Sequence, residues 1–182
     1  MATIDIILGP MFSGKSEELC RRIRRYEAIN IKCLKINHTL DTRTDEFIQT
    51  HSNIKIPAIK SNILMPLKDS EFFKKSKVIA IDEAQFFNDL YDFIKYCESM
   101  KKTVIIAGLD GDSDRNSFGQ ILQCIPLCDS VVKLKSYDMI NKDGTAAIFT
   151  MRINKNEINQ VSVGGSDKYI SVSRTNYLER DQ

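Results

Sequence analysis

Apolar runs alternate with segments of helical spacing through the first three quarters of the chain. Five runs are continuous enough to form buried strands, and they span Thr3 to Leu8, Ile29 to Ile36, Val78 to Ile81, Thr103 to Ala107 and Ser130 to Leu134. Four segments carry apolar residues at helical spacing, and they span Ser16 to Ala28, Leu67 to Lys75, Phe86 to Met100 and Ser117 to Ile125. This alternation predicts an α/β fold in which helices cover both faces of a mostly parallel sheet.

The pattern changes after about residue 135. Residues 146–153 and 159–163 predict two short strands around a polar turn, and Gly164-Gly165 precedes a polar tail. We therefore expect a core over residues 1–135 and a small antiparallel flap domain over residues 136–182. Two polar stretches within the core, at 37–53 and 110–117, are long enough to be functional loops.

Composition limits the possible classes of protein. A chain of 182 residues has room for one globular domain and a small appendage, and its 42% hydrophobic and 27% charged residues are typical of a soluble fold. The net charge of +2 does not favour a nucleic-acid or membrane partner. The N-terminal run resembles neither a secretion signal nor a membrane span, and the five cysteines form no C-x-x-C pair. We expect a cytoplasmic protein with reduced thiols.

The sequence GPMFSGKS at positions 9 to 16 fits the phosphate-loop pattern G-x-x-x-x-G-K-[ST] and lies between a predicted strand and a predicted helix. Gly9 and Gly14 let the backbone curl so that its N–H groups and the positive helix end face a triphosphate. Lys15 would bridge the β- and γ-phosphates, and the Ser16 hydroxyl would bind Mg²⁺. The other interpretation is an ordinary Gly-rich turn. In this context the motif predicts a P-loop NTPase core of the RecA-like type, with ATP bound by Gly9, Pro10, Met11, Phe12, Ser13, Gly14, Lys15 and Ser16.

Two adjacent carboxylates, Asp82 and Glu83, follow the apolar run at Val78 to Ile81. At the carboxyl edge of a parallel sheet, Asp82 would lie where a Mg²⁺ held by Ser16 needs another oxygen ligand. Glu83 would then be free to accept a proton from an attacking hydroxyl or water. Taken alone, an Asp-Glu pair after a strand is more often a helix N-cap, but the phosphate loop reverses that preference.

Other charged groups carry less information. Four arginines, at positions 21, 22, 24 and 25, are explained better as the solvated face of an amphipathic helix than as a site for an anionic partner. His38 and His51 have no partner at ligand spacing, so we interpret them as polar loop groups and not as metal ligands.

The motifs in their order resemble the P-loop, zinc-bearing type of thymidine kinase, from about residue 3 to residue 177. The matching segments are GPMFSGKS, RRIRRYEA, KCLK at 32–35, DTR at 41–43, TH at 50–51, IDEAQFF at 81–87, AGLDGD at 107–112, SFG at 117–119 and GGSDKY at 164–169. The resemblance implies transfer of the γ-phosphate of MgATP to the 5′-hydroxyl of thymidine, which yields dTMP for nucleotide salvage. It also implies a homotetramer that binds small-molecule substrates.

The resemblance assigns roles in catalysis and in the ATP site. Glu83 takes the position of the general base, with Lys15 and Arg43 beside the transferred phosphate, and Asp82 takes that of the acidic residue near Mg²⁺. Asp41 and Arg43 match the family's Asp-x-Arg, in which the Asp orients the metal and its waters. Gln85 falls in the same motif as Glu83 and is assigned to the ATP site.

The resemblance also implies a nucleoside pocket under a lasso loop that binds the base largely through backbone atoms. The corresponding residues here are Gln160, Val161, Ser162, Val163 and Gly164, with Tyr169 beside the sugar and base. Five further residues are candidates for the wall of the base pocket: Met11, Phe86, Leu109, Phe118 and Thr150. For the apolar ones, simple core packing is an equally good interpretation.

The chain departs from the family pattern in two places. Ser113 stands where the family has a phenylalanine that stacks on the base, so a stacking contact of about 1 kcal/mol is missing. At the family's four zinc ligands the chain has Asp138, Asn141, Ser173 and Asn176, which do not suit a tetrahedral zinc site. We predict that no structural zinc is bound.

Two other functions stay open. The chain could be a P-loop ATPase module in which Glu83 activates water and the flap binds a protein or nucleic acid. It could also be a decayed nucleotide-binding or regulatory subunit, as Ser113 and the missing zinc ligands suggest, although Lys15, Ser16, Asp82, Glu83 and Arg43 are all present.

Overall fold

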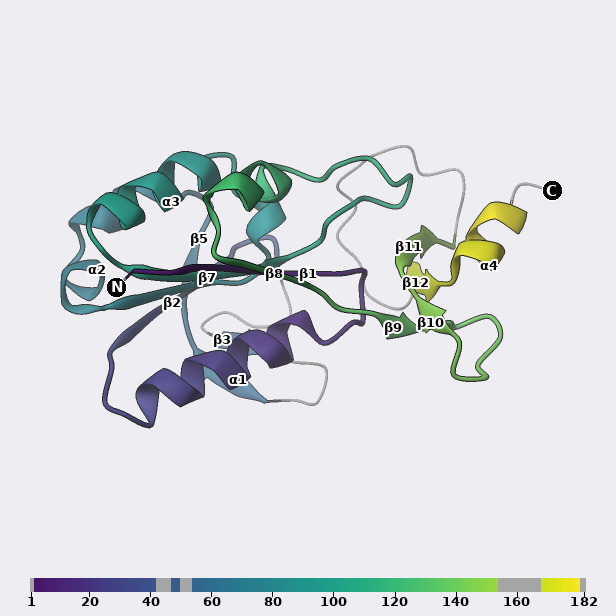
Figure 1. Ribbon diagram of the computed structural model, residues 1–182, viewed down its shortest axis with the longest axis horizontal. Helices are drawn as coiled ribbons and strands as arrows, with labels where there is room; N and C mark the ends of the chain where they lie inside the picture. Colours follow the sequence, from purple (N-terminus) through teal and green to yellow (C-terminus); the bar gives the residue numbers. More distant parts are fainter. Residues whose placement is uncertain (1, 42–46, 50–53, 154–167, 181–182) are drawn as a thin grey trace.

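Six parallel strands form the centre of the computed structural model, which describes residues 2–41, 47–49, 54–153 and 168–180 (Figure 1). In the order in which they pair, the strands are β5 (Ile59–Ser61), β2 (Cys33–His38), β6 (Val78–Ile81), β7 (Thr103–Gly108), β1 (Ile4–Leu8) and β8 (Ser130–Lys133). Five of them confirm the predicted strands, although β2 begins four residues later than expected. The sixth, β5, is a three-residue edge strand in a polar context that gave no clear signal.

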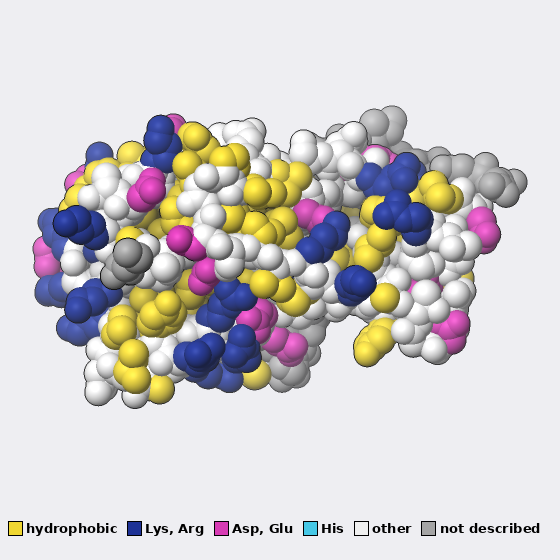
Figure 2. All heavy atoms as spheres, viewed as in Figure 1, with side chains coloured by type: hydrophobic (Ala, Val, Ile, Leu, Met, Phe, Trp, Pro, Cys, Tyr) yellow, Lys and Arg dark blue, Asp and Glu magenta, His cyan; other side chains and the backbone are white. Residues whose placement is uncertain are grey.

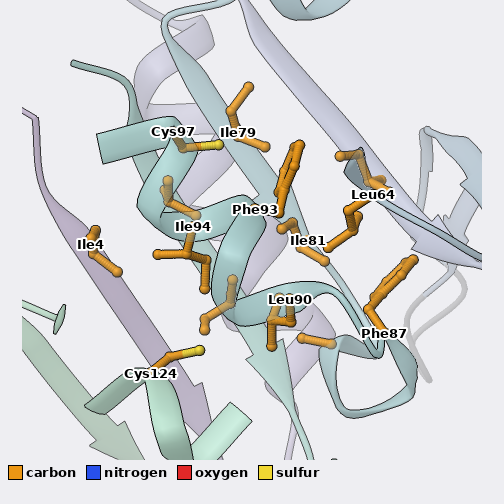
Figure 3. Close-up of a cluster of buried hydrophobic side chains, with 14 of the residues drawn as sticks. Ile4, Leu64, Ile79, Ile81, Phe87, Leu90, Phe93, Ile94, Cys97 and Cys124 are labelled. Carbon is orange, nitrogen blue, oxygen red and sulfur yellow. The ribbon is translucent and has the colours of Figure 1, made fainter. Parts of the chain in front are cut away.

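Both faces of the sheet are buried, and the strand residues divide between them with a period of two. One core is covered by α3 (Leu90–Ser99) and contains the strand residues Ile6, Ile79, Ile81, Val104 and Ile106. The opposite core is covered by α1 (Lys15–Glu27) and contains Ile7, Val78, Ala80, Ile105 and Ala107. Figure 3 shows Leu90, Phe93, Ile94 and Cys97 of α3 beside Ile79 and Ile81. Alternation within continuous apolar runs explains why these strands read as uniformly hydrophobic.

The helices differ from the prediction mainly at their ends. The predicted helix at 67–75 is a 3₁₀ turn, η1 (Met65–Asp69), followed by α2 (Glu71–Lys75), and the Ser70 hydroxyl between them caps α2 by accepting from the Phe73 N–H at 3.1 Å. The predicted helix at 86–100 begins only at Leu90, after a short turn η2 (Ala84–Phe86). The helix predicted at 117–125 is the 3₁₀ segment η3 (Ile121–Leu127), in which Pro126 cannot donate an α-helical hydrogen bond.

Part of the predicted polar loop at 37–53 is regular structure. Strands β3 (Phe47–Gln49) and β4 (Lys55–Pro57) form an antiparallel pair, and their Ile48 and Ile56 join the core under α1. The exposed face of α1 agrees with the sequence interpretation, because Arg21 and Arg22 both bind Glu18 while Leu19 and Ile23 are buried. The hydrogen bond from Arg21 and the neighbouring Arg22 lower the pKa of Glu18 to about 2. Within the described residues, no helix is both long and apolar enough to span a membrane.

A small lobe lies beyond the carboxyl ends of the parallel strands (Figure 1). It consists of β9 (Ser136–Tyr137), β10 (Ala146–Ala147), β11 (Phe149–Arg152), β12 (Tyr169–Val172) and α4 (Arg174–Glu179), and we call it the appended lobe. β9 pairs with β10 and β11 with β12, both antiparallel. The expected polar tail was wrong, because β12 and α4 occupy it. The predicted strand at 159–163 lies outside the described residues.

An arginine–aromatic cluster joins the appended lobe to the core. The Tyr177 ring lies 5.1 Å from that of Phe149, and the guanidinium groups of Arg115 and Arg180 lie 4.7 and 4.1 Å from the Tyr177 centroid. The Tyr177 hydroxyl donates to the Ser113 carbonyl at 2.7 Å, and Arg180 donates to the same oxygen. Figure 2 shows basic side chains gathered beside hydrophobic ones on this lobe. The loop at 110–117 is therefore fastened to α4.

The four residues at the positions of the family's zinc ligands bind one another. The Asp138 carboxylate is 1% exposed and accepts from the backbone N–H groups of Ile140 and Asn141 at 2.8 and 3.1 Å. Its second oxygen accepts from the Ser173 N–H at 2.6 Å and from the Asn176 amide at 2.9 Å. The Asn176 amide also donates to the Asn141 side chain at 3.0 Å. A carboxylate thus stands at the centre of these positions, surrounded by hydrogen-bond donors.

This carboxylate stabilises the lobe as an anion. Burial alone would raise the pKa of Asp138, but the hydrogen bonds from Ser173, Asn141 and Ile140 outweigh burial and lower it well below its usual value. One carboxylate, one hydroxyl and two amides suit this hydrogen-bonded arrangement and do not suit zinc. The absence of zinc stays a prediction that elemental analysis tests.

We expect Asp138→Asn to destabilise the protein by about 2 kcal/mol or more, because hydrogen bonds to a buried charge are among the strong ones. Urea unfolding at pH 7 measures the loss. Since the folded-state pKa lies below the unfolded value of 3.8, the contribution is present above that pH and declines as the pH falls below it. The gap between wild type and variant should therefore narrow below about pH 4. Asp143→Asn, at an exposed carboxylate in the same loop that also accepts a backbone N–H, is the control and should change little.

Candidate active site

The phosphate loop connects β1 to α1 at the carboxyl edge of the sheet. Gly14 is the N-cap of α1 in a left-handed conformation, with φ of 80°. The Lys15 ammonium donates to the Pro10 carbonyl at 2.7 Å, and the Ser13 hydroxyl donates to the same oxygen at 2.8 Å. The loop is thus curled around its own second residue, with Lys15 held across it and the N-terminus of a 13-residue helix at its end.

Gly9 is the position where the loop has no room for a side chain. Its φ is 152°, and a Cβ there would lie 2.8 Å from the Leu134 carbonyl oxygen and 2.6 Å from the Ser13 hydroxyl. The Leu134 N–H in turn donates to the Leu8 carbonyl at 2.8 Å. The loop therefore turns directly against the end of β8, from which the chain passes into the appended lobe.

Two hydrogen bonds fasten the phosphate loop to the appended lobe. The Met11 N–H donates to the Thr150 hydroxyl on β11 at 2.9 Å, and the Ser136 hydroxyl on β9 donates to the Phe12 carbonyl at 3.1 Å. Thr150 is 5% exposed. The sequence assigned Met11 and Thr150 to the wall of the base pocket, and the structure brings them together. Ser136 was not singled out, because nothing in its sequence context distinguishes it.

Two carboxylates, Asp82 and Glu83, follow β6 directly. Asp82, 2% exposed, continues the strand alternation on the face covered by α1. Burial first, and then the charge of Asp82, raise the pKa of Cys20 to about 11, and Cys20 lies one helical turn after Ser16 on α1. Asp82 therefore lies on the face of the sheet that α1 covers, and α1 carries the Ser16 hydroxyl in its first turn. Oxygen donors of this kind are the ligands that Mg²⁺ prefers, so the residues present fit that ion.

Glu83 ends the strand in a left-handed conformation, with φ of 52° and ψ of 40°. Its carboxylate accepts a hydrogen bond from the Gln85 amide at 2.8 Å. The Gln85 carbonyl oxygen accepts from the Leu109 N–H, just beyond β7, at 3.0 Å. The Gln85 side chain therefore bridges Glu83 and Leu109. The sequence assigned Gln85 to the ATP site and Leu109 to the base pocket, and both assignments stay predictions.

Asp41 is held in a polar cluster at the end of β2. Its carboxylate is 8% exposed and accepts from the Asn37 amide at 2.7 Å. The Lys60 ammonium donates to the Asp41 backbone carbonyl and lies 3.9 Å from its carboxylate. Asn37 was missed because the predicted strand ended at Ile36, two residues before β2 ends, and Lys60 was missed because β5 was not recognised. Arg43, the second member of the predicted pair, lies outside the described residues.

His38 belongs to an aromatic group and is not the polar loop residue that the sequence suggested. It is the last residue of β2, 5% exposed, and its ring lies 4.7 Å from that of Phe87 and 5.4 Å from that of Phe86. Burial lowers its pKa, while the nearby Glu83 charge raises it in part. Phe86 in turn meets Phe118 edge to face at 5.4 Å. Two residues predicted for the base pocket are thus in contact beside the Glu83 side of the sheet.

The remaining predicted residues divide into two groups. Tyr169 lies in β12, where its hydroxyl accepts from Arg152 at 3.4 Å. The predicted lasso residues, from Gln160 to Gly164, lie outside the described residues. Apart from these and Arg43, the predicted site residues of the core are all found at the carboxyl edge of one parallel sheet, where P-loop folds bind their ligands.

Comparison with known proteins decides the family. A family model described as thymidine kinase matches residues 2–177. The chain belongs to the thymidine kinase family. It is therefore a kinase with the P-loop nucleotide-binding fold, as the resemblance implied.

Curated members of the thymidine kinase family align along nearly all of the chain. The cytosolic thymidine kinase of Bos taurus is 41% identical over 178 residues, which cover 97% of this chain and 72% of that protein. The cytosolic thymidine kinase of Homo sapiens is 41% identical over 177 residues, covering 97% and 74%. The thymidine kinase of Choristoneura fumiferana entomopoxvirus is 40% identical over 188 residues, covering 98% of both chains.

Among solved structures, the flagellar accessory protein FlaH from Methanocaldococcus jannaschii aligns with a TM-score of 0.47 and 14% identity, over 72% of this chain and 70% of that one. The fold assignment rests on the strand order itself. The phosphate-loop strand β1 and the carboxylate strand β6 are separated by β7, and all three are parallel.

We expect Thr150→Val to weaken ATP binding about five- to tenfold. Valine keeps the shape of threonine but removes the hydroxyl, which leaves the Met11 N–H without its acceptor and loosens the loop by about 1 kcal/mol. Titration calorimetry with a non-hydrolysable ATP analogue measures the change. Thr150→Ser keeps the hydroxyl and is the control. Equal affinity in the valine and serine variants would show that this hydrogen bond does not shape the loop.

Proposed function

We propose that this chain transfers the γ-phosphate of ATP to the 5′-hydroxyl of thymidine and releases dTMP and ADP. The observation that supports the proposal is that the phosphate loop follows β1 and the Asp82-Glu83 pair follows β6, at the same edge of one parallel sheet, in a chain of the thymidine kinase family. A cytoplasmic location and a homotetramer are part of the proposal. Light scattering of the purified protein tests the oligomeric state.

The proposed chemistry is in-line phosphoryl transfer with Glu83 as general base. Its carboxylate accepts the 5′-hydroxyl proton as the oxygen attacks the γ-phosphorus, and the bond to the ADP oxygen breaks. Lys15 and the backbone N–H groups at the start of α1 stabilise the negative charge on the phosphate oxygens. Ser16 and Asp82 would hold Mg²⁺, which when bound neutralises charge on the β- and γ-phosphates. Asp41 and Arg43 are proposed to act beside the metal waters and the transferred phosphate.

The nucleoside is proposed to lie between the core and the appended lobe, taken as residues 136–182. Phe86, Phe118 and Leu109 would form one wall, with Met11 and Thr150 beside the phosphate loop. Backbone atoms of residues 160–164 and the ring of Tyr169 would close the other side. The closeness of Thr150 to Met11 supports this arrangement, because it joins the nucleoside side of the pocket to the ATP side.

Ser113, where the family has a base-stacking phenylalanine, is buried and hydrogen-bonded. It is 6% exposed, and its carbonyl accepts from Tyr177 and Arg180. The contact between Phe86 and Phe118 supplies aromatic surface near Glu83. We propose that these rings take over base packing from the phenylalanine that the family has at position 113.

We expect Glu83→Gln to lower kcat about 100-fold or more, because the amide cannot accept the hydroxyl proton. The affinity for ATP should stay within about twofold of wild type, since the phosphate loop is intact. A coupled ADP assay and a titration with the ATP analogue measure the two effects. Glu98→Gln, at an exposed position in α3, is the control. Near-normal turnover in Glu83→Gln would overturn the assignment of the base.

A substrate panel tests the reaction itself. We expect ADP formation with MgATP to depend on thymidine, and the product to be dTMP by mass spectrometry, with deoxyuridine and deoxycytidine as comparison substrates. ATP turnover that ignores nucleosides and rises with DNA would instead support the P-loop ATPase module. ATP binding with no turnover under any condition would support the decayed regulatory subunit.

A further inference from the structure

Gln85 is buried and uses both ends of its side chain. It is 2% exposed and lies in the short turn η2, two residues after Glu83. Its amide nitrogen donates to a Glu83 carboxylate oxygen at 2.8 Å, and its carbonyl oxygen accepts from the Leu109 N–H at 3.0 Å. One side chain therefore connects the end of β6 to the end of β7 through the carboxylate of the proposed base.

Two glycines, Gly108 and Gly119, pack so closely against Gln85 that neither position has room for a side chain. A Cβ on Gly108 would lie 2.5 Å from the Gln85 side-chain oxygen, and a Cβ on Gly119 would lie 2.0 Å from the Gln85 backbone carbonyl. Both distances are shorter than any van der Waals contact permits. The last residue of β7 and the segment that precedes η3 therefore pack against Gln85 without side chains of their own at these points. The amide is held where it reaches Glu83.

Glu83 needs such an external support because its own backbone is unusual. A left-handed conformation is uncommon for a residue with a side chain, and it persists where the surrounding structure enforces it. Glu83 follows β6 and lies beyond the residues of that strand that pair with β2 and β7. His38 on β2 is close enough for the Glu83 charge to raise its pKa in part, and Asp82 is next to Glu83 in the chain. Gln85 contributes a neutral donor that holds the carboxylate without sharing a proton with it.

We propose that Gln85 is a positioning residue, which fixes the Glu83 carboxylate relative to the strand end that carries Leu109 and so aims the base at the bound nucleoside. The proposal rests on the proposed function, in which Glu83 is the general base. It gives Gln85 a role different from contact with ATP. Only a side chain that donates and accepts at the same time satisfies both partners, so glutamate and methionine, which are similar in length, each fail in a distinct way.

Gln85→Glu keeps an acceptor for the Leu109 N–H and replaces the donor to Glu83 with a second carboxyl group. We expect kcat at pH 7 to fall about 10- to 100-fold, as a misplaced catalytic group does, while KM for ATP and the affinity for the ATP analogue stay within about twofold. The acid limb of the kcat–pH profile should move to higher pH, because two carboxyl groups in contact do not readily ionise together. Gln85→Met removes both hydrogen bonds and should lower kcat without moving that limb.

Gln120 offers a matched control. Its side-chain oxygen accepts from the Tyr91 N–H at 3.0 Å, as that of Gln85 accepts from Leu109, but its contact is at the start of α3. Gln120→Glu and Gln120→Met should keep the wild-type kcat and pH profile. Thermal unfolding of all four variants separates a loss of stability from a loss of positioning.

Several outcomes would overturn the proposal. Wild-type kcat and pH profile in Gln85→Glu would show that the contact with Glu83 is not used. A parallel fall in kcat, ATP affinity and thermal stability, or failure of both Gln85 variants to fold while both Gln120 variants fold, would make the residue structural. Weakened ATP binding with kcat unchanged would instead support the sequence assignment of Gln85 to the ATP site. Absence of thymidine-dependent turnover in the wild type is a separate result, and it would count against the proposed function itself.

Discussion

The arrangement of the site depends on one close contact, in which Gly9 of the phosphate loop turns against the backbone of Leu134. A side chain at position 9 would collide with that carbonyl, and the φ of 152° is available to glycine alone at little strain. The contact brings the phosphate loop to the end of β8, two residues before the appended lobe begins with Ser136. Close to this contact, the Ser136 hydroxyl donates to the Phe12 carbonyl and the Met11 N–H donates to the Thr150 hydroxyl. The ATP side and the nucleoside side of the proposed site thus share one short stretch of backbone.

The appended lobe must keep its shape for this coupling to work, and it does so with few residues. Its strands are two to four residues long, and pairs of strands this short are marginal by themselves. The Asp138 carboxylate compensates by accepting from donors on both sides of the lobe, in the loop after β9 and at the start of α4. A metal ion would gather the same segments by attracting four anionic ligands. Here a single central anion accepts hydrogen bonds from four neutral donors. The central charge is therefore negative and not positive, while the segments that it joins are the same.

Much of the core could be predicted because burial on both sides of a parallel sheet leaves a direct trace in the sequence. The five apolar runs and the phosphate-loop pattern were enough to predict the parallel sheet and to place Lys15, Asp82 and Glu83 at the ends of its strands. The short edge strand β5 left no such trace in the sequence. The contact between Lys60 on β5 and Asp41 was therefore not predicted either. His38 looked like a loop residue because its aromatic neighbours, Phe86 and Phe87, are far away in the sequence and follow the next strand of the sheet. The expected polar tail was wrong because α4 is stabilised by a cap from Ser173 and by Tyr177, and a six-residue helix has too few positions to show helical spacing.

Asp82 and Glu83 are adjacent in the chain, although the proposed function gives them different roles. Successive residues of a strand point to opposite faces, so Asp82 follows Val78 and Ala80 toward α1 and the phosphate loop. Glu83 accepts a hydrogen bond from Gln85 and lies near His38, beside the residues where the nucleoside is proposed to bind. The left-handed turn at Glu83 follows the end of the strand and begins the short segment η2. The proposed metal ligand thus continues the alternation of β6, whereas the proposed base, one residue later, lies in the left-handed turn that follows the strand. Because the proposed base lies beyond the last strand pairing, the Gln85 amide is the neighbour that we propose to position it.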